Sequence, residues 1–213
     1  HCTRKTAIRK CGTMYNMRYA FMLLGVMTCI VFVGAFVVLS KKAEAPVVQD
    51  INLELPMTFT LTSPAFVDGG QIPSKYTCDG ENISPEMRIE NVPEGTKSLI
   101  LLMDDPDIPD SVKQLRGIEK FDDWVLYNIP STTSVIPEGE IVGTGGLNSR
   151  GESAYAGACP PDREHRYFFR IYAVSGTLNF TKAPTLDEVE DAANGMMLGK
   201  ATLMGKYERV KLP

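Results

Sequence analysis

Two segments near the middle of the chain, SLILLM at residues 98–103 and WVLYNI at residues 124–129, are almost continuously apolar. Both are short, rich in branched or aromatic residues and flanked by Asp or Pro, which favours strands over helices. A strand without polar alternation has both of its faces covered. We therefore expect these two strands at the centre of a β structure, with other parts of the chain packed on each side.

Other stretches rich in branched and aromatic residues are bounded by Gly, Pro, Asn or Asp and predict further strands. They lie at residues 59–62, 87–92, 167–174 and 207–212. Short strands separated by turn residues are typical of a sandwich. The sequence thus predicts a mainly β fold, an antiparallel sandwich of two sheets.

One late helix is indicated after Thr185. Thr185 and Glu188 have the spacing of a capping box, and Gly195 stands where a helix would end. Apolar residues fall on one face of this helix at Leu186, Val189 and Ala193. We expect this face to pack on the sandwich.

The charges divide the chain into a basic and an acidic part. Residues 1–42 carry seven Lys and Arg and no Asp or Glu, so the remainder has 22 − 7 = 15 cations against 26 acids, or −11. A nucleic-acid-binding core should be basic where it folds. The acidic remainder therefore argues against nucleic acid as a partner.

Residues 19–39 form an uncharged run that matches the ~30 Å hydrocarbon thickness of a bilayer. We expect a basic cytoplasmic stub at 1–18, a transmembrane signal anchor at 19–39, a tether at 40–56 and one domain at 57–213. Because more basic residues precede the run than follow it, the domain should lie outside the cytoplasm as part of a single-pass membrane protein. The competing reading is a signal peptide cleaved after Ala45.

The cysteines agree with this topology. Cys2 and Cys11 fall on the expected cytoplasmic side and Cys29 in the membrane run, which leaves Cys78 and Cys159 in the exported part. An oxidising compartment permits these two to form a disulfide. The alternative is two separate buried thiols, because sequence alone does not place their Cα atoms.

Known catalytic motifs are missing from the sequence: it has no P-loop, no paired CxxC, no HExxH and no GxSxG. Three clusters could carry polar chemistry: DDPDIPD at 104–110, FDDW at 121–124, and YAGACPP at 155–161 followed by HRY at 165–167. The first could equally be a solvated turn. The histidine of the third could donate to an anion, or could cap a strand end beside a carboxylate.

In this order, the clusters and the segments around them resemble the phosphatidylethanolamine-binding protein family, especially its bacterial and archaeal Raf kinase inhibitor-like branch. The nine matching segments are TSPAF 62–66, IP 72–73, YTCDGENISP 76–85, VPEGTKSL 92–99, DPDIP 105–109, WVLYNIP 124–130, YAGACPP 155–161, HRY 165–167 and LMGKY 203–207. The resemblance implies a two-sheet β fold with a small pocket for phosphate-type anions or phospholipid headgroups. It also implies a protein that acts by binding, with a kinase or protease as partner, and neither enzyme activity nor a cofactor.

Carried over residue by residue, the resemblance implies a set of roles around this pocket. Asp105, Asp107 and Pro109 would form one wall, Phe121 and Ala156 an apolar lining, His165 and Tyr167 the donors, and Cys159 the floor. The aspartates would keep His165 cationic, and backbone N–H groups near Gly157 would add donors.

At one pocket position this chain departs from the family, because Asp123 stands where a histidine is usual. The change replaces a donor by an acceptor and adds up to one negative charge, which would cost an anion a few kcal/mol at most. It also raises an alternative, a Ca²⁺ site built from Asp105, Asp107, Asp110 and Asp123. A hydrolase using His165 as base is a third reading.

Overall fold

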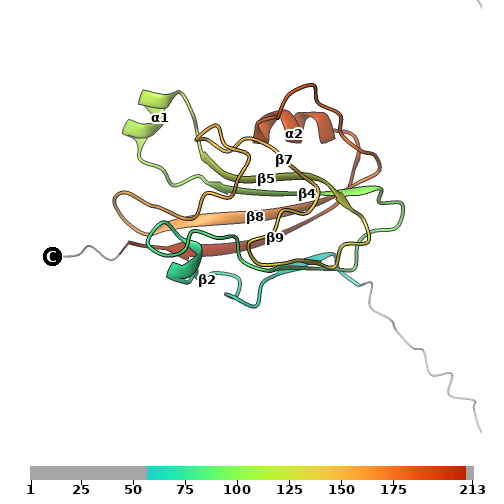
Figure 1. Ribbon diagram of the computed structural model, residues 1–213, viewed down its shortest axis with the longest axis horizontal. Coiled ribbons are helices and arrows are strands. Elements are labelled where there is room, and N and C mark those ends of the chain that lie inside the picture. Colours follow the sequence, from blue (N-terminus) through green and yellow to red (C-terminus); the bar gives the residue numbers. More distant parts are fainter. Residues whose placement is uncertain (1–56, 210–213) are drawn as a thin grey trace, which may run out of the picture. The chain divides into compact units, whose positions relative to one another are not determined.

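The computed structural model describes residues 57–209. Within them the strands are β1 (Thr60–Thr62), β2 (Gly70–Gln71), β3 (Met87–Glu90), β4 (Ser98–Asp105), β5 (Phe121–Pro130), β6 (Val135–Ile136), β7 (Thr144–Gly145), β8 (His165–Val174) and β9 (Met197–Tyr207). The helices are the 3-10 helix η1 (Ser74–Tyr76) and the α-helices α1 (Asp110–Arg116) and α2 (Leu186–Ala193). Figure 1 shows their arrangement.

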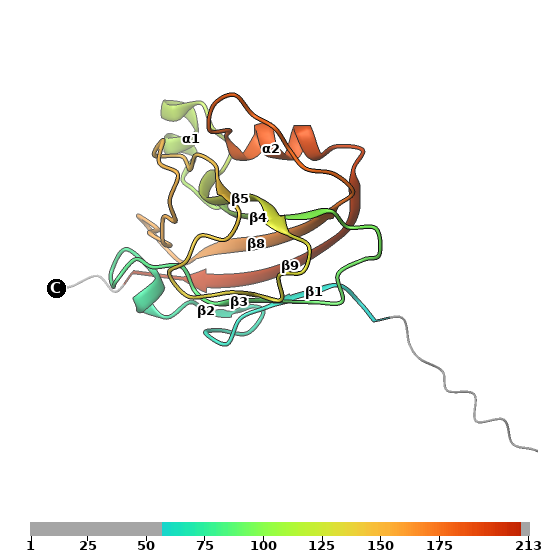
Figure 2. The ribbon, with the colours of Figure 1, turned by 45° about the vertical axis from the view of Figure 1, so that its right-hand side comes forward.

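The strands form two sheets, one in the order β1-β3-β6 and one in the order β2-β9-β8-β4-β5-β7. The strand pairs are antiparallel except β2 with β9, which is parallel. In Figure 2 the smaller sheet lies beneath the larger one. The prediction of a mainly β fold with two sheets is confirmed.

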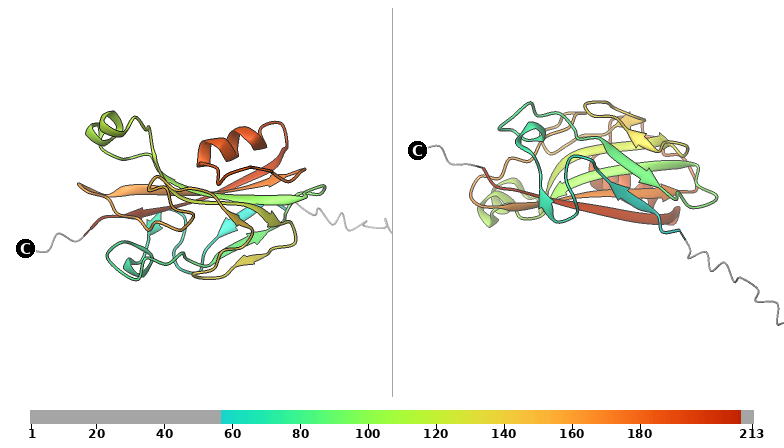
Figure 3. Two further views of the ribbon diagram at one scale, coloured as in Figure 1. Left: turned by 45° about the horizontal axis from the view of Figure 1, so that its top comes forward. Right: turned by 90° about the horizontal axis from the view of Figure 1, so that it is seen from below.

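The apolar segments at 98–103 and 124–129 lie in β4 and β5, which are neighbours in the larger sheet. All eight residues of β4 are buried. Leu101 belongs to the core between the two sheets, while Leu102 packs on the other face with Val189 of α2. Figure 3 shows the three layers, with α2 on one face of the larger sheet and the smaller sheet on the other. Both faces of the central strands are covered, as their continuous apolar character predicted.

The late helix is present with the predicted cap: the Thr185 side chain accepts from the Glu188 backbone N–H, and the Glu188 side chain accepts from the Thr185 N–H. A final strand was predicted at 207–212, but β9 ends at Tyr207, and Glu208 and Arg209 are not in a strand. Residues 210–212 of that prediction lie outside the described residues. Most of β9 before Leu203 is exposed or half-buried, so its first half lacks the apolar pattern that marks a strand.

Helix α1 was not predicted. It is seven residues long and none of them is buried, so its sequence has no apolar stripe from which a helix could be predicted. Within residues 57–209 no helix combines the length and apolarity that a bilayer crossing needs. The predicted membrane span at 19–39 lies outside the described residues.

Candidate functional site

A cavity of about 290 Å³ opens at the end of β4 that carries Asp105, beside α1 and the first residues of β5 and β8. This volume is at the small end of the range for ligand pockets. The residues around the cavity are Asp105, Ile108, Pro109, Val112, Arg116, Phe121, Asp123, Arg150, Gly157, Cys159, Pro161 and Tyr167. The buried members Asp105, Asp123 and Tyr167 form its floor, and the exposed Arg116 and Arg150 stand at its rim.

A β-bulge aims Asp123 into the cavity. Met103 pairs with Trp124 and the next residue, Asp104, pairs with Asp122, so Asp123 is an extra residue in β5. Without the bulge, strand alternation would send Asp123 to the face opposite Trp124. Instead Asp123 joins the cavity, while Asp122 lies near Lys120 on the α2 side, 3.7 Å from its ammonium.

Asp123 is enclosed in the protein and only 3% exposed. Burial, and then the neighbouring carboxylates of Asp105, Asp104 and Asp122, raise the pKa of Asp123 well above its usual range. Its neutral form is thereby favoured. From the sequence alone, Asp123 was expected to add up to one negative charge, but its surroundings in the fold disfavour that charge.

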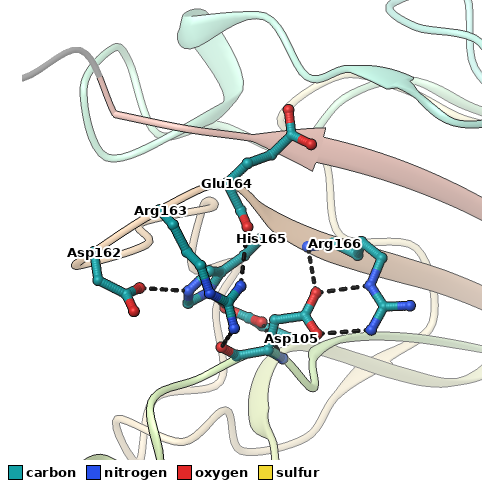
Figure 4. A network of polar contacts seen from close by, with 7 residues as sticks. Asp105, Asp162, Arg163, Glu164, His165 and Arg166 are labelled. Atoms are coloured by element: carbon teal, nitrogen blue, oxygen red, sulfur yellow. Dashed lines mark hydrogen bonds and ion pairs between the residues drawn. The ribbon is translucent and has the colours of Figure 1, made fainter.

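Asp105 forms a buried pair with His165 at the back of the floor. His165 Nδ1 lies 2.7 Å from Asp105 Oδ2. His165 Nε2 lies 2.8 Å from Asp162 Oδ1, a contact that Figure 4 shows. Each ring nitrogen of His165 therefore faces a carboxylate oxygen at hydrogen-bond distance. His165 is fully buried and is not among the cavity-lining residues, so its role is to hold Asp105 in place. Because both ring nitrogens already contact carboxylates, neither is left to donate to a ligand.

Asp107 is not among the cavity-lining residues, and its contacts hold the start of β8. Its carboxylate accepts from Nε and Nη2 of Arg166, each at 2.7 Å, and from the Arg166 backbone N–H. These contacts lower the pKa of Asp107 to about 2, against an ordinary 3.8. The Asp107 N–H in turn donates to Asp105 Oδ1 at 2.8 Å. Asp107 therefore positions Asp105 instead of facing a ligand.

The loop at 155–161 is tied to the loop at 77–82. Cys78 and Cys159 form a disulfide with their Cα atoms 5.4 Å apart, and Cys159 lines the cavity. The Gly157 N–H donates to Asn82 Oδ1 at 2.8 Å, so it is not the free donor that the resemblance implied. Ala156 is buried outside the lining, and its N–H donates to the Asp123 carbonyl.

Of the residues predicted for the site, the structure gathers Asp105, Pro109, Phe121, Asp123, Cys159 and Tyr167 around the cavity. Asp107, Ala156 and His165 are not among the residues that line the cavity. Sequence reasoning missed the two rim arginines, because Arg116 lies on the unpredicted α1 and Arg150 in a polar loop without a motif. Arg116 lies over Phe121, with its Cζ 5.4 Å from the ring centroid.

The alternative of a Ca²⁺ site finds no support in residues 57–209, where no group of three or more His, Cys, Asp or Glu side chains is placed to hold a metal. Asp110 is exposed at the start of α1. The oxygens of Asp105 and Asp107 are engaged by donors of the protein itself.

Comparisons with known proteins point to one family. The family model described as phosphatidylethanolamine-binding protein matches residues 62–208. A UPF0098 protein of Chlamydia pneumoniae is 41% identical over 150 residues, covering 70% of this chain and 98% of the relative. A UPF0098 protein of Methanothermobacter thermautotrophicus is 40% identical over 159 residues, covering 70% of this chain and 98% of that relative.

Two solved structures have the same fold. A phosphatidylethanolamine-binding protein homologue from Chlamydia trachomatis, CT736, matches with a TM-score of 0.68 and 38% identity, over 72% of this chain and 99% of that one. YbcL of Escherichia coli, described as a member of the mammalian family of such proteins, matches with a TM-score of 0.64 and 27% identity, over 72% of this chain and 100% of that one.

Proposed function

The chain belongs to the phosphatidylethanolamine-binding protein family, and on that premise we propose a membrane-anchored binding protein whose cavity takes phosphate-type anions or phospholipid headgroups. The observation that carries the proposal is the combination of a small cavity with two exposed arginines at its rim. A guanidinium recognises phosphate through paired hydrogen bonds. The apolar wall of Ile108, Pro109 and Val112 suits a small organic substituent.

Binding without catalysis is favoured by the kinds of group around the cavity. Among the described residues that line it there is no Ser, Thr or Lys, and its one cysteine is in the disulfide. Both ring nitrogens of His165 are held by carboxylates, so this histidine is not free to act as a general base. These features speak against the hydrolase reading.

Display from a membrane is the second part of the proposal. The described residues begin near the end of the larger sheet that is away from the cavity. Phe59 lies next to Gly199 of β9. Gly199 is level with Leu99 at the start of β4, because both pair with Ala173 of β8. The cavity lies at the other end of β4, about 25 Å away at 3.3 Å per residue. A tether attached at Met57 therefore leaves the cavity mouth on the end remote from the attachment.

The binding proposal is tested by calorimetric titration of the full chain in detergent with glycerophosphoethanolamine and, in a separate arm, with inorganic phosphate. Binding in the first arm alone identifies a headgroup ligand, and binding in both identifies phosphate itself. Replacing Arg116 and Arg150 together by Gln should weaken binding about tenfold or more. Arg88→Gln is the matched control, because Arg88 is an exposed arginine of β3 outside the cavity. Absence of binding in both arms, or equal affinity in the double variant, would refute the proposal.

The anchor is tested by protease treatment of intact cells, where digestion of the domain is expected. Complete protection would contradict the proposed orientation. A kinase or protease partner stays a prediction.

A further inference from the structure

Two buried polar atoms of the cavity floor make no hydrogen bond of good geometry among the described residues: Oδ2 of Asp123 and the hydroxyl of Tyr167. The Asp105 carboxylate and the Cys159 N–H lie beside the Tyr167 hydroxyl without such a hydrogen bond. Their side chains are 3% and 1% exposed, and both line the cavity. Buried polar groups in folded proteins nearly always have a partner, and a missing one points to something that the cavity takes up. Because both residues line the same cavity, these two atoms are the candidate contacts for a ligand.

Other polar groups near the floor are already engaged. The two oxygens of Asp105 accept from the Asp107 N–H and from His165. His165 uses its second nitrogen on Asp162, and the Gly157 N–H is held by Asn82. A ligand that reaches the floor thus meets Asp123 and Tyr167 as its hydrogen-bonding partners.

The surroundings decide which way these hydrogen bonds run. Asp123 is buried beside other carboxylates, which favours its protonated form, and burial also raises the pKa of the Tyr167 phenol. A carboxylic acid kept neutral by burial can donate a hydrogen bond, and together with a tyrosine it can form an oxyanion hole. Both groups are therefore donors, and their complement is an oxygen that carries negative charge.

Resting on the proposed function, we propose that Asp123, as a protonated acid, and Tyr167 together hold one oxygen of a monoanionic ligand of the phosphodiester type. The rim arginines Arg116 and Arg150 face the rest of that anion. A single negative charge is favoured because the floor presents two neutral donors beside the Asp105 carboxylate, which lines the same cavity.

Binding should consequently weaken as the pH rises. Ionisation of Asp123 removes a donor and places a negative charge beside the ligand oxygen, so affinity falls once the pH passes the raised pKa of Asp123. A cationic ligand would show the opposite trend, because it needs the ionised form. The titratable and charged groups around Asp123 come from several elements. They are Asp104 and Asp105 of β4, Asp122 of β5, Arg116 of α1, Arg150 and Tyr155 of the loop between β7 and β8, and Tyr167 of β8.

The test is calorimetric titration of the full chain with dimethyl phosphate, whose charge does not change between about pH 5 and about pH 9, so that any pH dependence belongs to the protein. Wild-type affinity is expected to fall as the pH passes the raised pKa of Asp123, well above the ordinary 3.8 of an aspartic acid. Asp123→Asn keeps a neutral donor at every pH, so its affinity should no longer fall. Tyr167→Phe should bind about tenfold more weakly at low pH, through the loss of one hydrogen bond.

The matched control is Asp122→Asn, an adjacent acid with a raised pKa on the opposite face of the sheet. This variant should still lose affinity as the pH rises, with the fall moved to a somewhat lower pH because the Asp122 carboxylate helps to raise the pKa of Asp123. Thermal unfolding of each variant verifies that it folds. Binding of dimethyl phosphate that is independent of pH and unchanged in Asp123→Asn would overturn the donor pair while leaving the proposed function standing. Stronger binding of methylammonium at high pH, lost in Asp123→Asn, would overturn it in favour of a cation. Absence of dimethyl phosphate and glycerophosphoethanolamine binding at every pH would overturn both proposals.

Discussion

His165 and Asp105 lie 60 residues apart in the chain and meet in the protein interior, with Nδ1 of the imidazole 2.7 Å from Oδ2 of the carboxylate. His165 comes from the first position of β8 and Asp105 from the last position of β4, and these two strands are neighbours in the larger sheet. Both side chains are almost completely enclosed. The pair fixes Asp105 at the back of the cavity.

Replacing His165 by Leu should lower the free energy of unfolding by about 3 kcal/mol, because it leaves a buried carboxylate without its partner. Urea unfolding followed by the fluorescence of Trp124, the one tryptophan of the chain, measures this. Asp162→Asn is the control: Asp162 bonds the other ring nitrogen but is 46% exposed, so its loss should cost less than about 1 kcal/mol. Equal costs for the two variants would contradict the buried-pair interpretation.

The disulfide closes a loop between residues separated by 81 positions. Replacing Cys78 and Cys159 together by Ser should lower the free energy of unfolding by about 4 kcal/mol, because the unfolded chain regains the freedom of that loop. Urea unfolding with and without a reductant tests this. The wild type should lose stability when the disulfide is reduced, and the stability of the double variant should not change. A wild type whose stability is the same with and without reductant would contradict the expectation.

Asp122 should make stability depend on pH. Burial is the main cause that raises its pKa to about 6, from an ordinary 3.8. The folded state thus binds this proton more tightly than the unfolded state does, and stability is lost as the pH rises from about 4 to about 6. Asp122→Asn should therefore be more stable than the wild type above about pH 6, by about 1 kcal/mol, with the difference shrinking below about pH 4. Urea unfolding across this range checks it, and a constant difference would contradict the assignment.

Asp107 should have the opposite effect. Its hydrogen bonds from Arg166 lower its pKa to about 2, so the stability that it contributes is present above about pH 4 and is lost as the pH falls towards 2. Asp107→Asn should cost about 1 kcal/mol at neutral pH, a value kept modest because the Arg166 side chain is 52% exposed to solvent. The cost should vanish near about pH 2.

Arg166→Gln should reproduce the Asp107→Asn behaviour, because it removes the other half of the same ion pair. Acid titrations of unfolding for both variants test this. A cost that persists unchanged at the lowest pH would show that the ion pair is not its source.

Several features could be predicted because they depend on local patterns. The apolar runs at 98–103 and 124–129 marked the two buried strands, and Thr185 with Glu188 marked the start of α2. The first half of β9 and the whole of α1 could not be found in this way. Their residues bury too little apolar surface to leave a periodic signal.

The site was predicted in part. The sequence placed Asp105, Asp123 and Tyr167 in one pocket through resemblance, and the structure gathers them around one cavity. It did not show that the ring nitrogens of His165 are both occupied, since Asp162 had no motif to mark it. Nor did it identify Arg116 and Arg150, whose position depends on how α1 and a polar loop fold over the strand ends.

The sequence by itself determined a mainly β domain, its central strands and the residue types available at their ends, because burial and capping are encoded by neighbours along the chain. Only the tertiary structure decided what those residues do. One extra residue in β5 turns Asp123 towards the cavity and Asp122 towards Lys120. Burial among carboxylates then favours the neutral form of Asp123. Strand register and dielectric surroundings arise from contacts between distant segments, so the composition of either segment alone does not contain them.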